Sequence, residues 1–284
     1  MKLHLRTADV FIPDGRPTPE ALARTTHLAI GAHQDDLEFM AFHGIKECYH
    51  REDAWFTGVT CTNGSGSART GDYARCSDAE MMRLRRDEQR QAATIGRYSA
   101  MIQLDYPSAA ARDPADRRLT EDLAAIFSAT LPKIVYTHNP ADKHATHIAV
   151  VLPVIQAIRT LPLEVRPEKV HGCEVWRNLD WMQDTEKVVH DVSGHDNLAA
   201  ALNGLFDSQI AGGKRYDLGV VGRRRANATF FESHGVDTSD SLAFAMDLTP
   251  LIQDDSLDIV SYVTGFIDRF KADVIEKLRA QLGA

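Results

Sequence analysis

The sequence has few cysteines, no long apolar run and no excess of basic residues. Its 284 residues include four cysteines without a CxxC pair, which favours buried free thiols in a reducing compartment. These are Cys48, Cys61, Cys76 and Cys173. No window reaches the roughly 20 apolar residues of a membrane span, and the first residues lack the apolar core of a signal peptide. We therefore expect a cytoplasmic protein without a membrane span.

The charge balance narrows the class of partner. Lys and Arg number 32 against 40 Asp and Glu, which gives a net charge of −8. Phosphate backbones are bound by clustered basic residues, so this balance argues against nucleic acid or a membrane surface as the partner. A small anionic substrate stays possible, because a local basic pocket can lie on an acidic protein. A homo-oligomer also stays possible, since one sequence does not reveal an interface.

From Thr26 onward, strand-like and helix-like segments alternate. This alternation predicts βαβ units and an α/β fold: a Rossmann-like, mainly parallel sheet flanked by helices. The expected strands are residues 27–32, 54–62, 101–104 and 133–137, and the expected helices are residues 37–51, 77–95, 120–131 and 146–160.

The remaining segments are less regular. Residues 1–26 lack periodicity and are interpreted as an N-terminal arm. We expect residues 27–284 to form a single domain, with a core over 27–160 and a C-terminal extension from about 161 to 284. Within the extension, residues 173–176 and 188–192 suggest strands, and residues 195–211 and 258–282 suggest helices.

Two patches of metal-binding chemistry each follow a predicted strand. His33, Asp35 and Asp36 come directly after the apolar run at residues 28–31, and His144 and His147 follow the run at residues 134–136. In open α/β sheets, ligands bind outside the carboxyl ends of the strands. We therefore expect one site assembled from both patches.

The residue types suit a catalytic zinc ion, which usually has three protein ligands and leaves one position for water or substrate. His33 and Asp36 are placed to converge on one ion, and one histidine of the second patch completes the set. Bound zinc lowers the pKa of its water to about 7. Asp35 would then accept the proton of that water as general base. The remaining histidine, in its protonated form, would stabilise the oxyanion or protonate the leaving amine.

Each patch alone has a commoner explanation. Paired Asp residues at a helix start usually act as caps, and a histidine after a strand is usually a hydrogen-bonded structural group. The HxxH pattern is also weak in a chain with 12 histidines. The combination of HxDD after one strand and HxxH after a later strand is much rarer than either part, and it favours a metal site.

These residues resemble the LmbE-like, or PIG-L, family of zinc-dependent de-N-acetylases. The family motif AHPDDxE corresponds to residues 32–38, with Gln34 in place of Pro, and the motif HPDH corresponds to residues 144–147, with Pro and Asp lost. The resemblance covers residues 27–160 well. It implies Zn²⁺, or another divalent metal, held by His33, Asp36 and His147. It further implies that Asp35 is the general base and that His144 stabilises the oxyanion.

The resemblance also suggests substrate contacts. Arg85, in the segment Arg85 to Glu88, matches a helical RxxE pattern and is favoured over Arg86, and Asn63 lies in a loop typical of the family. Thr146 replaces a family Asp that would orient or pair with His144, so the pKa of His144 is an open question.

The expected activity is removal of an acetyl group from an N-acetylated amino sugar or related conjugate, a small-molecule substrate. One alternative is an amidase of the same chemistry that acts on another N-acyl or thiol conjugate. A non-catalytic Rossmann-like protein that binds a sugar or nucleotide is less favoured, because no GxGxxG turn follows the first strand.

Several further residues have two interpretations. Trp176, Trp181 and Tyr216 either line a sugar platform or pack in the interior. The run at residues 223–225 is either a solvated basic loop or an anion contact. His43 is either a supporting partner of the site or a packed helical residue, and His171 and His190 are interpreted as structural.

Overall fold

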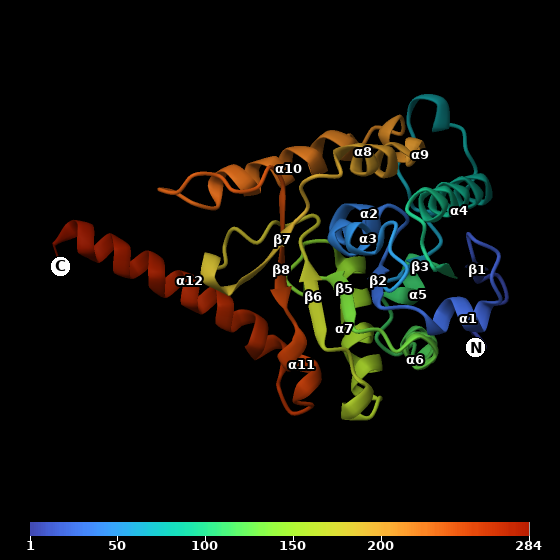
Figure 1. The fold of residues 1–284 in the computed structure, drawn as a ribbon, viewed down its shortest axis with the longest axis horizontal. Helices are drawn as coiled ribbons and strands as arrows, with labels where there is room; N and C mark the ends of the chain where they lie inside the picture. Colours follow the sequence, from blue (N-terminus) through green and yellow to red (C-terminus); the bar gives the residue numbers. More distant parts are fainter. Residues whose placement is uncertain (284) are drawn as a thin grey trace.

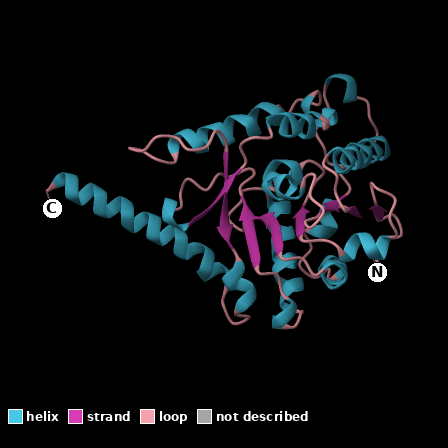
Figure 2. Cartoon of the chain, viewed as in Figure 1, coloured by secondary structure: helices cyan, strands magenta, loops and turns pink. Residues whose placement is uncertain are grey.

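The computed structural model describes residues 1–283, and an eight-stranded sheet forms its centre (Figures 1 and 2). The strand order is β1-β4-β3-β2-β5-β6-β8-β7. The five strands from β4 to β6 in this order are parallel, whereas β1 and β8 run antiparallel to their inner neighbours. The predicted Rossmann-like fold class is confirmed. The strands are β1 (Asp9–Phe11), β2 (His27–Gly31), β3 (Phe56–Thr62), β4 (Ala100–Tyr106), β5 (Ile134–His138), β6 (Lys169–Cys173), β7 (Lys187–Asp191) and β8 (Leu242–Asp247).

Helices cover both faces of the sheet, which explains why the central strands are nearly continuous apolar runs. The helices are α1 (Thr18–Ala23), α2 (Asp36–Met40), α3 (Phe42–Cys48), α4 (Asp78–Ile95), α5 (Ser108–Ala111), α6 (Arg118–Thr130), α7 (Ala145–Arg159), α8 (Asp196–Gly204), α9 (Asp207–Ile210), α10 (Tyr216–Phe230), α11 (Thr249–Gln253) and α12 (Ile259–Leu282). Short 3₁₀ turns lie at Gly71–Tyr73, Leu163–Val165 and Asp184–Glu186.

Successive residues of β2 show how two cores form. Leu28 and Ile30 pack in the cluster that includes α6 and α7, whereas Ala29 between them packs in the cluster that includes α2, α3 and α8. Neighbouring side chains of a strand point to opposite faces, so each apolar strand serves both cores. The carboxyl ends of β2 and β5, which are neighbours in the sheet, therefore lie side by side on a rigid support.

The N-terminal arm is more regular than expected. Residues 9–11 form β1, which pairs antiparallel with β4 from Asp9 opposite Gln103 to Phe11 opposite Met101. The guanidinium of Arg90 donates hydrogen bonds of 2.8 and 2.6 Å to both carboxylate oxygens of Asp9. A three-residue edge strand is too short to show an alternating pattern in the sequence.

Other boundaries also differ from the prediction. The helix expected over residues 37–51 is two helices, α2 and α3, because the backbone at Ala41 leaves helical geometry with φ −110° and ψ 20°. β6 ends at Cys173, so most of the strand expected over residues 173–176 is loop. β8 and α10 were not predicted. Among the described residues, no helix is both long and apolar enough to cross a membrane.

Candidate active site

The turn from β2 into α2 holds the first patch in a fixed shape. Asp35 has φ 96°, a left-handed conformation that is uncommon outside glycine and often marks a functional site. Its backbone N–H donates to Oε1 of Gln89 at 3.1 Å. The carboxylate of Asp36 accepts a 2.7 Å hydrogen bond from the backbone N–H of His33. These contacts turn the side chains of Asp35 and Asp36 in different directions.

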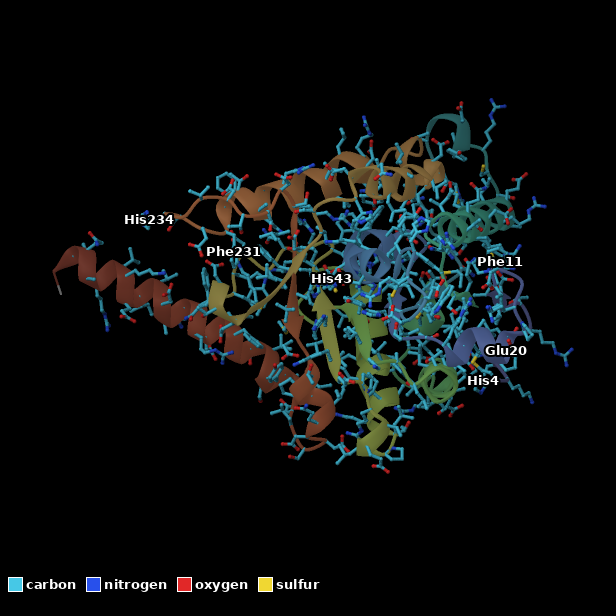
Figure 3. The ribbon with its side chains drawn as sticks, in the orientation of Figure 1. His4, Phe11, Glu20, His43, Phe231 and His234 are labelled. Carbon is cyan, nitrogen blue, oxygen red and sulfur yellow. The ribbon has the colours of Figure 1, made fainter. Side chains whose placement is uncertain are left out.

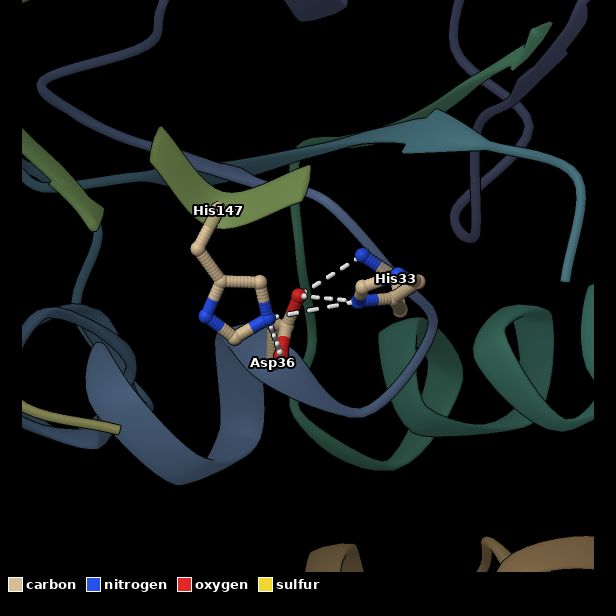
Figure 4. Close-up of side chains that lie close together, drawn as sticks. All are labelled: His33, Asp36 and His147. Carbon is tan, nitrogen blue, oxygen red and sulfur yellow. Dashed lines mark hydrogen bonds and ion pairs between the residues drawn. The ribbon is translucent and has the colours of Figure 1, made fainter. Parts of the chain in front are cut away.

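His33, Asp36 and His147 converge on one point (Figure 4). Nδ1 of His33 lies 3.3 Å from Asp36 Oδ2, and Nε2 of His147 lies 3.5 Å from Asp36 Oδ1. The two histidine nitrogens are 3.3 Å apart. One atom from each residue lies within 4.8 Å of the others, and two imidazoles with one carboxylate are a ligand set that zinc accepts. The residues present therefore fit a divalent metal ion.

The electrostatics of Asp36 support this arrangement. Burial would raise its pKa, but the neighbouring His147 and His138 hold the pKa of this carboxyl well below its ordinary value. Asp36 is only 3% exposed, so it stays an anion with its charge directed at the imidazole nitrogens. A buried carboxylate of this kind needs a positive partner.

Two residues behind the three converging groups were not anticipated. Oδ2 of Asp142 lies 2.9 Å from Nδ1 of His147, and both side chains are fully buried. When Nδ1–H donates to this carboxylate, Nε2 is left free to bind a metal. The ring of His138 stacks on His147 at 3.7 Å, and its Nε2 accepts a 2.9 Å hydrogen bond from the backbone N–H of Ala32. Their sequence signal is their position at and just after the end of β5, ahead of the HxxH pattern.

Asp35 lies beside the three converging groups and pairs with an arginine. Nη2 of Arg85 is 3.1 Å from Asp35 Oδ2. Burial raises the pKa of Asp35 to about 6, although the cation of Arg85 opposes the shift. Arg85 lines the cavity, and its Nη2 contacts Asp35 and the carbonyl of Gln34. Arg86 instead contacts Asp105 at 2.8 Å and does not line this cavity.

His144 faces the same point from the start of α7. Its ring centroid lies 5.0 Å from that of His33 and 4.5 Å from that of His147. Burial, reinforced by the neighbouring His147 and His33, lowers the pKa of His144 to about 4. Thr146 supplies no carboxylate to counter this effect. This shift favours a neutral imidazole, whereas the sequence analysis expects the protonated form.

A cavity of about 730 Å³ opens over these groups. The core contributes His33, Asp35, Asp36 and His144, and the C-terminal extension contributes Trp176, Lys214, Tyr216 and Arg223. The extension therefore builds the outer wall of the site. Asn63 does not lie on the cavity wall: its Oδ1 accepts a 3.1 Å hydrogen bond from the N–H of Ser65 and braces the loop.

The three tryptophan and tyrosine candidates separate into two groups. Trp176 lies between His144, whose ring is 5.9 Å away at 22°, and Tyr216, whose ring is 5.9 Å away at 89°. Both Trp176 and Tyr216 line the cavity. Trp181 packs against the interior instead, and its indole N–H donates to the carbonyl of Asn178.

The basic run at residues 223–225 is part of α10 rather than a loop. Arg223 donates to the carbonyl of Val175, and Arg225 pairs with Asp196 at 2.7 Å. Arg224 is buried and donates to the carbonyls of Glu38 and Phe39 at 2.9 and 3.0 Å. It therefore satisfies the last carbonyls of α2, the helix that begins with Asp36.

His43, His171 and His190 pack together away from the cavity. His43 lies 2.9 Å from the hydroxyl of Tyr136, and its ring stacks on His190 at 4.4 Å. Nε2 of His190 lies 3.0 Å from Nδ1 of His171. His43 is thus a packed helical residue, and the structural interpretation of His171 and His190 agrees with these contacts.

Comparison with known proteins agrees with this geometry. Residues 28–158 match the family model of GlcNAc-PI de-N-acetylase, PIG-L. The matched segment is therefore similar to this family, and it contains both patches and every residue of the converging set. No curated protein matches the chain.

Solved structures share the fold of this chain over both the core and the extension. N,N'-diacetylchitobiose deacetylase from Pyrococcus horikoshii has a TM-score of 0.59 and 18% identity, over 82% of this chain and 88% of that one. GalB, a 4-carboxy-2-hydroxymuconate hydratase from Pseudomonas putida, has a TM-score of 0.59 and 17% identity, over 79% and 96%. A zinc-inhibited teicoplanin deacetylase has a TM-score of 0.54 and 15% identity, over 78% and 98%.

Proposed function

We propose that this protein is a metal-dependent hydrolase that removes the acetyl group from an N-acetylated amino sugar or a related conjugate. The observation that carries the proposal is the convergence of His33, Asp36 and His147 at a cavity that Asp35, held by Arg85, also lines. The PIG-L family match over residues 28–158 supports it. The deacetylases among the similar structures support it further.

His33, Asp36 and His147 would hold the ion, with Zn²⁺ first among the divalent candidates. A divalent ion bound there supplies Lewis-acid activation of a water molecule. Asp35 accepts the proton of the attacking water, and a carboxyl with a pKa of about 6 is mostly ionised at neutral pH. Arg85 keeps this carboxylate oriented through its 3.1 Å contact.

His144 acts on the substrate side. As a neutral imidazole it donates one N–H to the carbonyl oxygen, on which negative charge develops during attack. Its ring is held between His147 and Trp176, so the donor is positioned before the substrate arrives. The proton taken up by Asp35 is then available for the departing amine.

Trp176 and Tyr216 supply the sugar platform. Aromatic faces bind the C–H faces of a sugar ring, and these two rings line the cavity next to His144. The volume of about 730 Å³ suits a small glycan or glycoconjugate. The alternative substrates are other N-acyl or thiol conjugates, which the same groups would hydrolyse.

The test combines metal analysis with acetate release across a panel of N-acetyl amino sugars and N-acyl conjugates, with and without a chelator. We expect stoichiometric divalent metal and chelator-sensitive acetate release. A metal-loaded protein that releases no acyl group from any member of the panel contradicts the proposal. GalB shares the fold, so hydration of 4-carboxy-2-hydroxymuconate is the matched control reaction.

A further inference from the structure

Helix α12 leaves the body of the protein about half-way along its length. Figure 1 shows it running outward to the C end, with no other element beside its far part. Its first half is anchored: Val263 and Phe266 are buried, and the hydroxyl of Tyr262 donates to the carbonyl of Asp247 at 2.6 Å. Arg269 pairs with Glu186, and its carbonyl accepts a 3.2 Å hydrogen bond from Gln183. Beyond Arg269, the one ion pair on the helix is internal, between Lys277 and Asp273.

The free part of α12 carries an apolar stripe. Ile267 is 45% exposed, Val274 38%, Leu278 58% and Leu282 80%. A helix has about 3.6 residues per turn, so spacings of seven, four and four place these four side chains on one face, which also carries the exposed Lys271. Ile275, 39% exposed, borders the same face. A lone helix of this length is marginal in water, and an exposed apolar stripe on it indicates a packing partner.

The charges beside the stripe point to a second copy of the same helix. Asp268 and Arg279 are eleven positions apart, which is about three turns, so they lie on the same flank. Neither has an ion-pair partner within residues 1–283, and both are exposed. An antiparallel copy brings Asp268 of each helix opposite Arg279 of the other. A parallel copy would instead place like charges at the same height.

The apolar side chains fit the same register. When Asp268 faces Arg279, Ile267 of one helix lies level with the gap between Leu278 and Leu282 of the other, as in knobs-into-holes packing. Val274 then lies next to the two-fold axis, at nearly the same height as Val274 of the second copy. A surface that complements itself in this way is the requirement for a two-fold dimer.

We propose that the outer half of α12 pairs antiparallel with the same helix of a second copy of this chain to form a homodimer. One helix pair is a small interface, below about 1,200 Å² in total, so the dimer should dissociate on dilution. The proposal does not depend on the catalytic assignment, because none of these residues contacts the cavity.

Sedimentation velocity of the full chain over a range of micromolar concentrations tests this pairing. We expect a concentration-dependent dimer that Leu278→Glu abolishes. Ala280→Glu introduces the same charged side chain on the opposite face of the helix. It is the matched control and should leave the dimer intact. Circular dichroism and acetate release should be unchanged in both variants, since neither position packs against the body.

A charge-exchange series tests the orientation. We expect Asp268→Arg and Arg279→Asp each to raise the dimer dissociation constant at least severalfold, and the double variant to restore it. A chain that stays monomeric at every concentration overturns the proposal. So does a dimer that Leu278→Glu leaves intact. A dimer that the double exchange fails to restore overturns the antiparallel register.

Discussion

At the scale of single residues, two adjacent carboxylates have different tasks. Asp36 points at the imidazoles of His33 and His147, whereas Asp35 pairs with Arg85. We expect Asp35→Asn to retain metal and lose activity by about 10²- to 10⁴-fold, the usual contribution of a general base. Asp36→Asn should lose the metal itself. Metal analysis of both purified variants, with acetate release, checks this division, and equal metal loss in the two would contradict it.

The two histidines of the second patch separate in the same way. His147 has its Nδ1 held by Asp142 and its Nε2 directed at Asp36, whereas His144 turns towards Trp176. His147→Ala should therefore lose most of the metal, and His144→Ala should keep it while turnover falls. The measurement is metal content set beside turnover at saturating substrate. Retention of metal by His147→Ala would exclude this residue as a ligand.

The pH dependence of the rate follows from Asp35. A general base works only when ionised, and burial raises the pKa of this carboxyl to about 6. A bound cation would lower that pKa, so turnover should be flat near neutral pH and fall tenfold per unit at acid pH, with the bend at or below about pH 6. Metal content measured at each pH separates this effect from metal loss. A rate that rises as the pH falls would refute the assignment.

At the scale of elements, the sequence predicted those parts whose signal is local. β2 and β5 are apolar runs, each followed by histidines and carboxylates. Once the fold class places the carboxyl ends of these strands side by side, His33 and His147 are expected to converge. The outer wall has no such signal. α10 buries only Arg224 and Ala228 among its fifteen residues, which leaves no apolar periodicity to detect. Asp142 contacts His147 from an irregular loop, where no spacing rule applies.

The loop after β6 gives a prediction about substrate binding. Trp176 lines the cavity, whereas Trp181 on the same loop packs in the interior. We expect Trp176→Ala to raise KM about tenfold, because a lost aromatic face costs about 1 kcal/mol or more. Trp181→Ala is the matched control: it should lower the melting temperature and leave KM unchanged. An unchanged KM in Trp176→Ala would remove this residue from the substrate site.

At the scale of the whole molecule, a cluster of buried histidines links stability to pH. His27, His43, His171 and His190 surround Tyr136 between α3 and the sheet, and Figure 3 shows His43 inside the body. Burial lowers the pKa of His27 and of His171 to about 4, and it holds that of His190 well below its ordinary range. Glu47, Asp191 and Asp247 oppose the shift on their nearest histidines, but burial and the mutual repulsion of the rings prevail.

The sign of the linkage predicts acid sensitivity. Below about pH 6.5 the histidines of the unfolded chain bind protons that the folded cluster does not. The contribution of the cluster to stability is therefore complete above that pH and is lost as the pH falls towards about 4. Each such histidine contributes about 1.4 kcal/mol per pH unit within this window. Urea unfolding of the metal-free protein at pH 7, 6 and 5 measures the slope. His190→Gln should make it shallower by about that amount. A slope that His190→Gln leaves unchanged would show that this histidine is not held neutral.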